Sequence, residues 1–239
     1  EKIKDQDVWS GCEQEYSLMD ATTGRPLGWP ANPREFPASQ GPFYCGVGAH
    51  VAFGRNVKDE HYDMCVEADI KIAGTNGEVA AGQWEYQIGI CNGIEIGDHM
   101  YMARYILQRV CEKHDLYATF DPKIIGGDWN GAGCHWNLST KLMRAPDTGR
   151  EEIKRVIDRL SATHKSHIAV YGEGNEKRLT GRHETASIDK FSFGVADRGA
   201  SVRIPRQTDA DGYGYIEDRR VAANCCPYLV AGTIANTIS

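Results

Sequence analysis

Trp9-Ser10-Gly11-Cys12-Glu13-Gln14-Glu15-Tyr16 is a short stretch in which two carboxylates stand two positions apart. Residues two apart in a strand point to the same face of a sheet, so Glu13 and Glu15 are expected side by side. Like charges on one face repel each other unless a cation lies between them, and a bound divalent metal is a common solution. A solvated strand face is the alternative, and this stretch alone leaves both open.

Composition describes a globular chain. Its 239 residues are enough for one large domain or two small ones. The net charge of −6 disfavours a nucleic-acid binder, whose affinity depends on neutralising phosphates. No run of about 18 apolar residues is present, so we expect no membrane-spanning segment and no membrane partner.

The eight cysteines include no CxxC pair, and the polar start does not read as a secretory signal. We therefore expect reduced thiols, a cytoplasmic protein, and no structural zinc site.

Hydrophobic periodicity predicts amphipathic helices over 57–73, 98–114 and 150–168, with Asp98 as an N-cap, and a terminal helix that begins at Pro227. Alternation of apolar and polar residues predicts strands at 9–16, 82–89, 116–120, 134–139, 201–205 and 213–219. A run rich in glycine and proline, from 23 to about 48, predicts a long functional loop. No linker or internal repeat is evident, so we expect one domain over 1–239.

The predicted strands each carry an apolar and a polar side. In 82–89, Trp84, Tyr86 and Ile88 alternate with polar residues, and 134–139 alternates in the same way. If the helices cover the apolar side, the result is an α+β domain whose curved antiparallel sheet collects polar residues on its other face.

The polar strand faces carry carboxylates, one imidazole and arginines. Hard oxygen donors with a single histidine suit Mg²⁺ or Mn²⁺ better than zinc or copper. Arginines crowd the last third of the chain, and carboxylate-bound metals beside arginines are typical of phosphoryl transfer. Surface ion pairs are the alternative. The residues of this set are Glu13, Glu15, Glu85, His135, Tyr215, Glu217 and Arg219.

Six motifs, in the same order, resemble those of glutamine synthetase. Their spacing fits the eukaryotic type, and their residues are most similar to those of fungal members. They cover essentially the whole chain. They are Glu13-Gln14-Glu15-Tyr16, Asn76-Gly77-Glu78-Val79 with 83–89, 130–135, Arg178-Leu179-Thr180-Gly181-Arg182-His183-Glu184-Thr185, Arg203-Ile204-Pro205-Arg206 and Glu217-Asp218-Arg219-Arg220.

The resemblance implies the catalytic domain of a ligase that makes glutamine from glutamate and ammonia, with ATP as a substrate, through γ-glutamyl phosphate. It implies two or three Mg²⁺ or Mn²⁺ ions per site, held by Glu15, Glu78 and Glu85 on the glutamate side and by Glu13, His135 and Glu217 on the ATP side. It also assigns glutamate binding to Asn130, Gly131, Arg178 and Arg198, nucleotide binding to Trp9, Ser139, Arg144 and Tyr215, phosphoryl neutralisation to Arg203 and Arg219, and a closing flap to Glu184.

Members of this family form decamers, so the resemblance implies a homo-oligomer. They also carry an N-terminal β-grasp domain, whereas only eight residues precede Trp9. A catalytically impaired protein with a structural or regulatory role is therefore the alternative. A relative that ligates a bulkier amine is a third reading, and Glu184 in its Arg-His-Glu-Thr flap argues against it.

Overall fold

The computed structural model describes residues 3–30, 32–38 and 40–239. Its strands form one open, mixed sheet of eight, in the order β2-β3-β1-β5-β8-β7-β6, with β4 paired to the far end of β1. The strands are β1 (Trp9–Asp20), β2 (Ile72–Gly77), β3 (Gln83–Asn92), β4 (Leu116–Thr119), β5 (Cys134–Ser139), β6 (Phe193–Val195), β7 (Val202–Ile204) and β8 (Ile216–Asp218).

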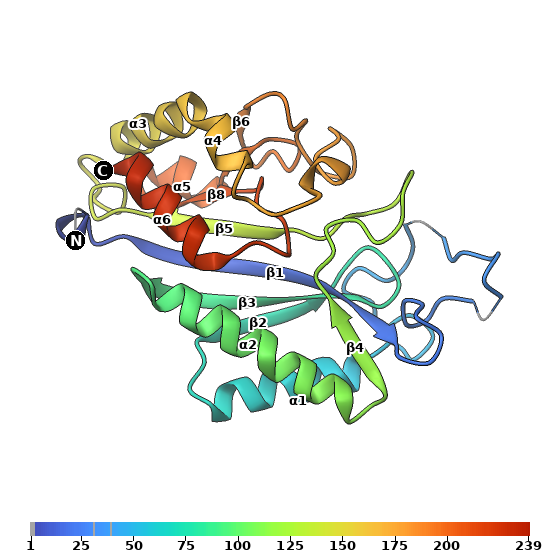
Figure 1. Cartoon of the computed structure of the whole chain (residues 1–239). Coiled ribbons are helices and arrows are strands. Elements are labelled where there is room, and N and C mark those ends of the chain that lie inside the picture. The colour runs from blue at the N-terminus through green and yellow to red at the C-terminus, as the bar shows by residue number, and fades with distance from the viewer. Residues whose placement is uncertain (1–2, 31, 39) are drawn as a thin grey trace.

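The long strand β1 runs through the middle of the molecule, and both chain ends lie near its beginning (Figure 1). It pairs antiparallel with β3 on one side and with β5 on the other. In this register Glu13 lies opposite His135, and Glu15 lies opposite Glu85. The register therefore places four of the predicted ligands on neighbouring strands.

The helices are α1 (Arg55–Glu67), α2 (Glu95–Glu112), α3 (Gly149–Ala162), α4 (His164–Ile168), α5 (Arg206–Asp211) and α6 (Pro227–Ile238), with short 3-10 turns at Lys4–Gln6 and Asn175–Lys177. Helix α2 packs against β1, β3 and β4, and α1 and α6 contact α2 (Figure 1). The apolar strand residues meet these helices in one core. Among the described residues, no helix combines the length and apolar character needed to cross a bilayer.

The terminal helix begins at Pro227 as predicted, and the central helix was predicted with a different start. Helix α2 begins at Glu95, so Asp98 lies in its first turn and is not the N-cap. The predicted helix over 150–168 is two helices, α3 and α4, which meet at Thr163. The Thr163 hydroxyl donates to the Arg159 carbonyl at 2.8 Å, a local bond that competes with helix continuation.

The predicted helix over 57–73 is wrong in its last part. Helix α1 ends at Glu67, and Asp69 adopts a left-handed φ of 55°, which turns the chain into β2. The predicted strand at 213–219 is only Ile216–Asp218, and neither β6 nor α5 was predicted. The expected antiparallel sheet is confirmed except for β6, which runs parallel to β7.

Candidate active site

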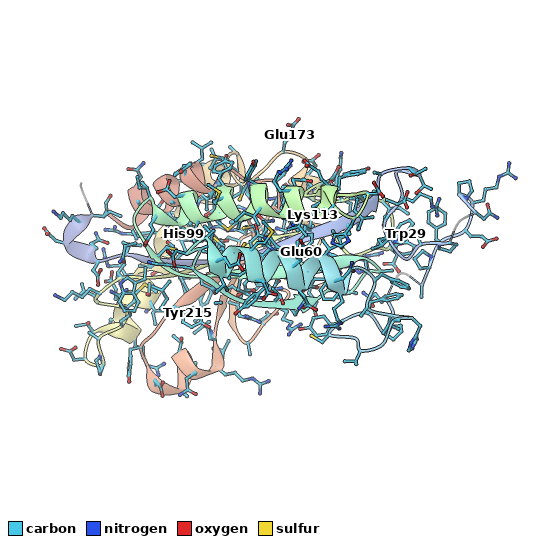
Figure 2. The ribbon with its side chains drawn as sticks, turned by 90° about the horizontal axis from the view of Figure 1, so that it is seen from below. Trp29, Glu60, His99, Lys113, Glu173 and Tyr215 are labelled. Carbon is cyan, nitrogen blue, oxygen red and sulfur yellow. The ribbon has the colours of Figure 1, made fainter. Side chains whose placement is uncertain are left out.

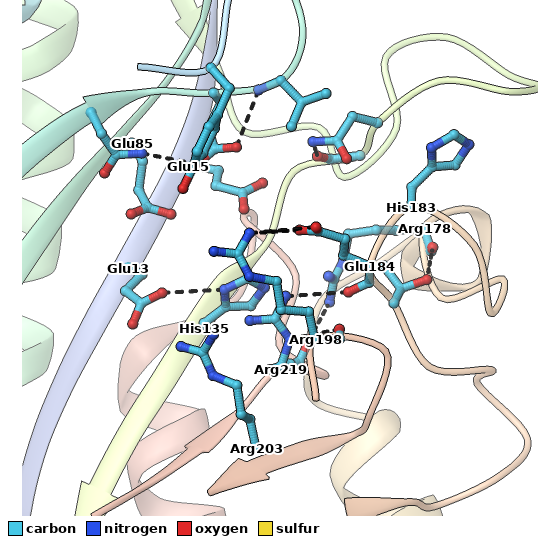
Figure 3. Close-up of a pocket in the computed structure, with 17 residues that line it drawn as sticks. Glu13, Glu15, Glu85, His135, Arg178, His183, Glu184, Arg198, Arg203 and Arg219 are labelled. Carbon is cyan, nitrogen blue, oxygen red and sulfur yellow. Dashed lines mark hydrogen bonds and ion pairs between the residues drawn. The ribbon is translucent and has the colours of Figure 1, made fainter. Parts of the chain in front are cut away.

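A polar cavity of about 130 Å³ opens on the sheet face opposite the apolar core (Figure 3). Strands β1, β2, β3, β5 and β7 supply part of its lining, and the segments after β2, before β7, directly after β8 and around residues 44, 130 and 184 supply the rest. The residues that line it are Glu13, Glu15, Tyr44, Asn76, Glu78, Val79, Glu85, Asn130, Gly131, His135, Arg178, His183, Glu184, Thr185, Arg198, Arg203 and Arg219.

One compact ligand group lies at the junction of β1, β5 and β8. The ligand atoms of Glu13, His135 and Glu217 are within 4.8 Å of one another. His135 Nδ1 lies 3.4 Å from Glu13 Oε2 and 3.4 Å from Glu217 Oε1. The Asn137 amide donates to Glu13 Oε1 at 2.8 Å and fixes that carboxylate. The structure thus brings together the three residues predicted for the ATP-side metal.

A second group comprises Glu15, Glu85 and again His135. The Gly133 amide donates to Glu15 Oε2 at 2.8 Å, so this carboxylate is fixed by the backbone of the strand beside it. Glu78 lines the same cavity and repels Glu15, although it belongs to neither compact group. The predicted trio of the glutamate side is therefore gathered in one cavity. His135, which was predicted for the ATP side alone, also belongs to this second group.

The second group is electrostatically unfavourable as it stands. Burial and the repulsion of Glu78 raise the pKa of Glu15 to about 8. Burial and the repulsion of Glu15 raise the pKa of Glu85 to about 9, and burial raises that of Glu78 to about 7. These three carboxylates cannot easily be ionised at the same time, and a bound cation would stabilise their ionised forms.

Arginines surround the buried Glu217. Arg203 and Arg219 both form ion pairs with it, and the Arg219 Nη1 to Glu217 Oε1 distance is 2.6 Å. Arg178 is buried and donates to the carbonyls of Arg219 and Val221. Burial, together with the nearby positive charge of Arg219, lowers the pKa of His135 well below its usual value. His135 is therefore neutral, which is the form that binds a metal.

These observations fit a divalent cation of the Mg²⁺ or Mn²⁺ kind. The donors are carboxylate oxygens with one neutral imidazole, and none of the described residues that line the cavity is a cysteine. The carboxylates are crowded beyond what their hydrogen bonds offset.

The segment 180–187 lies over the cavity and holds Glu184. His183 and Glu184 both have left-handed backbone, with φ of 54° and 58°, which is uncommon for non-glycine residues. The Glu184 carboxylate lies 3.2 Å from Arg198 Nη1, and Arg219 donates to its backbone carbonyl (Figure 3). The backbone of this segment therefore directs a charged side chain at the pocket.

A second cavity, of about 320 Å³, lies beside the first and is mostly apolar. All four residues predicted for the nucleotide line it: Trp9, Ser139, Arg144 and Tyr215. The Arg144 guanidinium lies 3.8 Å from the centre of the Trp9 ring and donates to Ser139 Oγ at 3.0 Å. A flat aromatic wall beside a fixed cation suits a planar, phosphate-bearing ligand.

The predicted glutamate-binding residues also line the first cavity. At Gly131 a Cβ would approach Arg178 Cγ to 2.6 Å and the Pro122 carbonyl to 2.7 Å, so only glycine fits there. Sequence reasoning missed Tyr44, Asn76 and His183 as cavity residues. Asn76 and His183 stand inside the motifs that carry the resemblance, whereas Tyr44 comes from an irregular loop without a pattern.

Comparisons with known proteins agree with this site. The family model described as "Glutamine synthetase, catalytic domain" matches residues 2–237. The chain belongs to the glutamine synthetase family. It is 57% identical to the chloroplastic glutamine synthetase of Zea mays over 236 residues, which are 99% of this chain and 55% of the relative. It is 56% identical to glutamine synthetase of Neurospora crassa over 233 residues, 98% of this chain and 63% of that relative.

The chain spans about half the length of the plant glutamine synthetases it matches, and somewhat more of the fungal ones. The matched part is the catalytic domain, and its α+β architecture is the one observed here.

Proposed function

We propose that this chain is the catalytic part of an ATP-dependent ligase that joins glutamate and ammonia to give glutamine. The observation that carries the proposal is the pairing of two cavities. One gathers the carboxylates, His135 and the arginines, and the other places Trp9 and Arg144 beside it.

In the first half-reaction, a γ-carboxylate oxygen of glutamate attacks the γ-phosphorus of ATP, and ADP leaves. Arg203 and Arg219 line the cavity, and both pair with the buried Glu217. There they offset the charge that builds up on the transferring phosphoryl group. A divalent metal, when bound, offsets further charge on the phosphates. Glu13, His135 and Glu217 would hold one ion, and Glu15, Glu85 and Glu78 another.

In the second half-reaction, ammonia attacks the γ-carbon of γ-glutamyl phosphate, and phosphate leaves with the bonding electrons. The attacking nitrogen must lose a proton, and the Glu184 carboxylate is the acceptor that faces the cavity. Arg178, Arg198, Asn130 and Gly131 would hold the glutamate. Water competes with ammonia for the acyl phosphate, so the 180–187 segment must also exclude it.

The relatives carry additional sequence that this chain does not include. We propose that, as in the family, the active protein is a homo-oligomer. The stability of that assembly is a separate question from the chemistry of the cavity.

The test is formation of γ-glutamyl hydroxamate from glutamate, ATP and hydroxylamine in the presence of Mg²⁺ or Mn²⁺. We expect wild-type turnover, and a loss of about 10²-fold or more in Glu184→Ala. The matched control is Glu173→Ala, an exposed acid outside the cavity (Figure 2). It should keep wild-type activity.

Absence of hydroxamate at saturating metal, from protein that is folded by circular dichroism, would overturn the proposal for this chain. Binding of ADP without turnover would then favour the catalytically impaired protein. Equal activity in Glu184→Ala and wild type would remove Glu184 from the reaction.

A further inference from the structure

A second cluster of metal-ligand side chains lies on the core side of the sheet, away from both cavities. Cys91 is the second-last residue of β3, Glu95 is the first of α2, and His99 follows one turn later. Their ligand atoms all lie within 4.8 Å of one another. Figure 2 places His99 beside the helices and apart from Tyr215 of the nucleotide cavity.

Local structure explains this convergence. Gly93 adopts a φ of 55° in the tight turn between β3 and α2, where no side chain is needed. Glu95 and His99 are four residues apart on one face of α2. The turn brings Cys91 of β3 close to that face of α2. Three side chains of different chemistry therefore meet at the turn between β3 and α2.

We propose that Cys91, Glu95 and His99 form a zinc-binding site, with solvent as the fourth ligand. His99 Nε2 lies 3.6 Å from Glu95 Oε1. Two ligands of a tetrahedral zinc ion, at bond lengths of about 2.0–2.1 Å, stand about 3.3–3.4 Å apart. Little movement is required. A thiolate, an imidazole and a carboxylate suit zinc, unlike the oxygen-rich active cavity.

The side chain that now neutralises the cluster is Lys71. Its Nζ lies 2.7 Å from Glu95 Oε1, and the side chain is 42% exposed. The backbone amide of Asn92 donates to the other oxygen of Glu95 at 2.9 Å and holds the carboxylate in place. An exposed ion pair contributes little, so zinc can replace the ammonium while Lys71 turns into solvent.

Zinc binding has two local requirements. The Cys91 thiol must lose its proton to solvent as the zinc–sulfur bond forms. His99 must carry its proton on Nδ1, and the 3.4 Å contact of that atom with the Lys71 amide is then given up. That contact is long for a hydrogen bond, so its loss is minor. Cys91 is buried, and the ion enters from the side of the half-exposed Glu95 and His99.

A zinc ion here would differ from the expectation drawn from cysteine spacing, which disfavoured a structural zinc site because no CxxC pair is present. The ligands here are spaced Cys-x3-Glu-x3-His across a strand–helix turn. It does not depend on the proposed ligase activity.

Cobalt provides a direct test, because Co²⁺ bound to a thiolate absorbs in the near ultraviolet through sulfur-to-metal charge transfer. Within the part of the chain that the structure describes, no cysteine lines the first cavity, so cobalt bound there gives no such band. We expect the full chain to show the band, saturating at one Co²⁺ per chain and abolished by added Zn²⁺. Cys91→Ser should abolish it. Cys45→Ser, which alters an exposed cysteine elsewhere, should leave it unchanged.

Two further variants, His99→Gln on α2 and Lys71→Ala just before β2, keep the test valid if Cys91→Ser does not fold. His99→Gln should weaken cobalt binding about 10-fold or more. Lys71→Ala should strengthen it about 2- to 5-fold, because it removes the competing ammonium. A merely structural role for Lys71 would not tighten metal binding. Absence of the band in wild type, its persistence in Cys91→Ser, or weaker binding in Lys71→Ala would overturn the proposal.

Discussion

Glu85 is the residue whose surroundings oppose its ionisation most clearly among the carboxylates of the cavity. It is 7% exposed and faces Glu15 across the β1–β3 pair. Its hydrogen-bond partner is Gln87, a neutral amide. With its pKa raised to about 9, the carboxyl holds its proton at neutral pH unless a cation is present.

Replacing Glu85 should therefore have opposite effects with and without metal. The folded-state pKa lies above the unfolded value of 4.5, so stability is lost as the pH rises from about 4.5 through about 9. Glu85→Gln removes this loss, and we expect the metal-free protein to gain about 1 to 3 kcal/mol at pH 7. The stabilisation by Mn²⁺ should shrink. Urea unfolding with EDTA and with Mn²⁺ measures both.

Glu173→Gln is the matched control, since it removes an exposed acid outside the cavity, and neither value should change. A metal-free Glu85→Gln protein that is less stable than wild type, and still gains fully from Mn²⁺, would contradict this assignment.

At this scale the sequence correctly predicted where the candidate ligands on the strands lie. Alternation placed Glu13, Glu15, Glu85 and His135 on one sheet face, because period-2 geometry is local. The sharing of His135 between two ligand groups was not predictable, because it depends on the register of three strands. Glu78 and Glu184 lie in loops, and only motif resemblance identified them.

At the scale of elements, the 180–187 segment is held by contacts from two other loops. His183 Nδ1 lies 3.1 Å from the Gln40 amide nitrogen, and His183 Nε2 lies 2.9 Å from Asp128 Oδ1. Gln40 belongs to the long loop after β1, and Asp128 to the glycine-rich loop before β5. These contacts keep the left-handed backbone of His183 and Glu184 in place over the cavity.

Loss of the His183 contacts with Gln40 and Asp128 should loosen the 180–187 segment and displace Glu184. We expect His183→Ala to lower the kcat for hydroxamate formation about 10- to 100-fold. The rate of ATP hydrolysis without hydroxylamine should rise relative to the rate of hydroxamate formation, because water enters the cavity. His183→Gln, which can contact both neighbours, should recover most of the activity. An unchanged ratio of hydroxamate to ADP in His183→Ala would show that these two contacts do not help to exclude water.

The packing of α1 on α2 encloses another histidine, His61. Its Nε2 lies 3.0 Å from the Ala103 carbonyl, and its ring packs edge-on against Tyr86 at 4.9 Å between centres. Burial lowers the pKa of His61 to about 4. The neutral ring is therefore part of the core.

His61 should make the fold sensitive to mild acid. The folded-state pKa lies below the unfolded value of 6.5, so its contribution is present above pH 6.5 and is lost as the pH falls towards 4. We expect about 1 to 3 kcal/mol of this loss to disappear in His61→Leu. Urea unfolding at pH 7, 6, 5 and 4.5 measures it. Parallel pH profiles of the two proteins would contradict the prediction.

Element prediction succeeded where periodicity was long and failed where it was short. The stripe of α2 extends over five turns, and tertiary contacts did not override it. Strand β2 was read as the end of a helix because Ile72 and Ala73 continue the apolar spacing of α1, and only the turn at Asp69 separates them. Strand β6 has three residues and was not predicted, and it forms by pairing with β7.

At the scale of the whole molecule, a buried polar network joins β8 to α4 and α6. Asp218 is fully buried and accepts two hydrogen bonds from the Arg220 side chain, at 2.8 and 2.6 Å, and one from Tyr171 at 2.8 Å. His167 bonds the Tyr171 hydroxyl and Thr237 of α6. His164 lies 2.9 Å from Arg220. The network therefore reaches from the strand of Glu217 to the terminal helix.

Sequence patterns predicted that polar and apolar faces exist, but not this network. Asp218 ends β8 and Arg220 follows it by two residues, and both side chains are buried, where charged residues are not expected. They are accommodated because α4, the turn after it and α6 bring His164, Tyr171 and Thr237 into the same network. The same limit applies to the strand order, which depends on long-range pairing of β5, β8 and β7.

Asp218→Ala should show that this network supports both the fold and the cavity. It leaves the buried Arg220 and Tyr171 without their partner, so we expect a loss of about 3 to 5 kcal/mol in urea unfolding. Tyr171→Phe removes one neutral donor and should lose only about 1 kcal/mol. Since Asp218 adjoins Glu217, the Mn²⁺ affinity of the folded Asp218→Ala protein should also fall about 10-fold. A loss below 1 kcal/mol with unchanged Mn²⁺ affinity would mean that the helices and the cavity are independent of this strand.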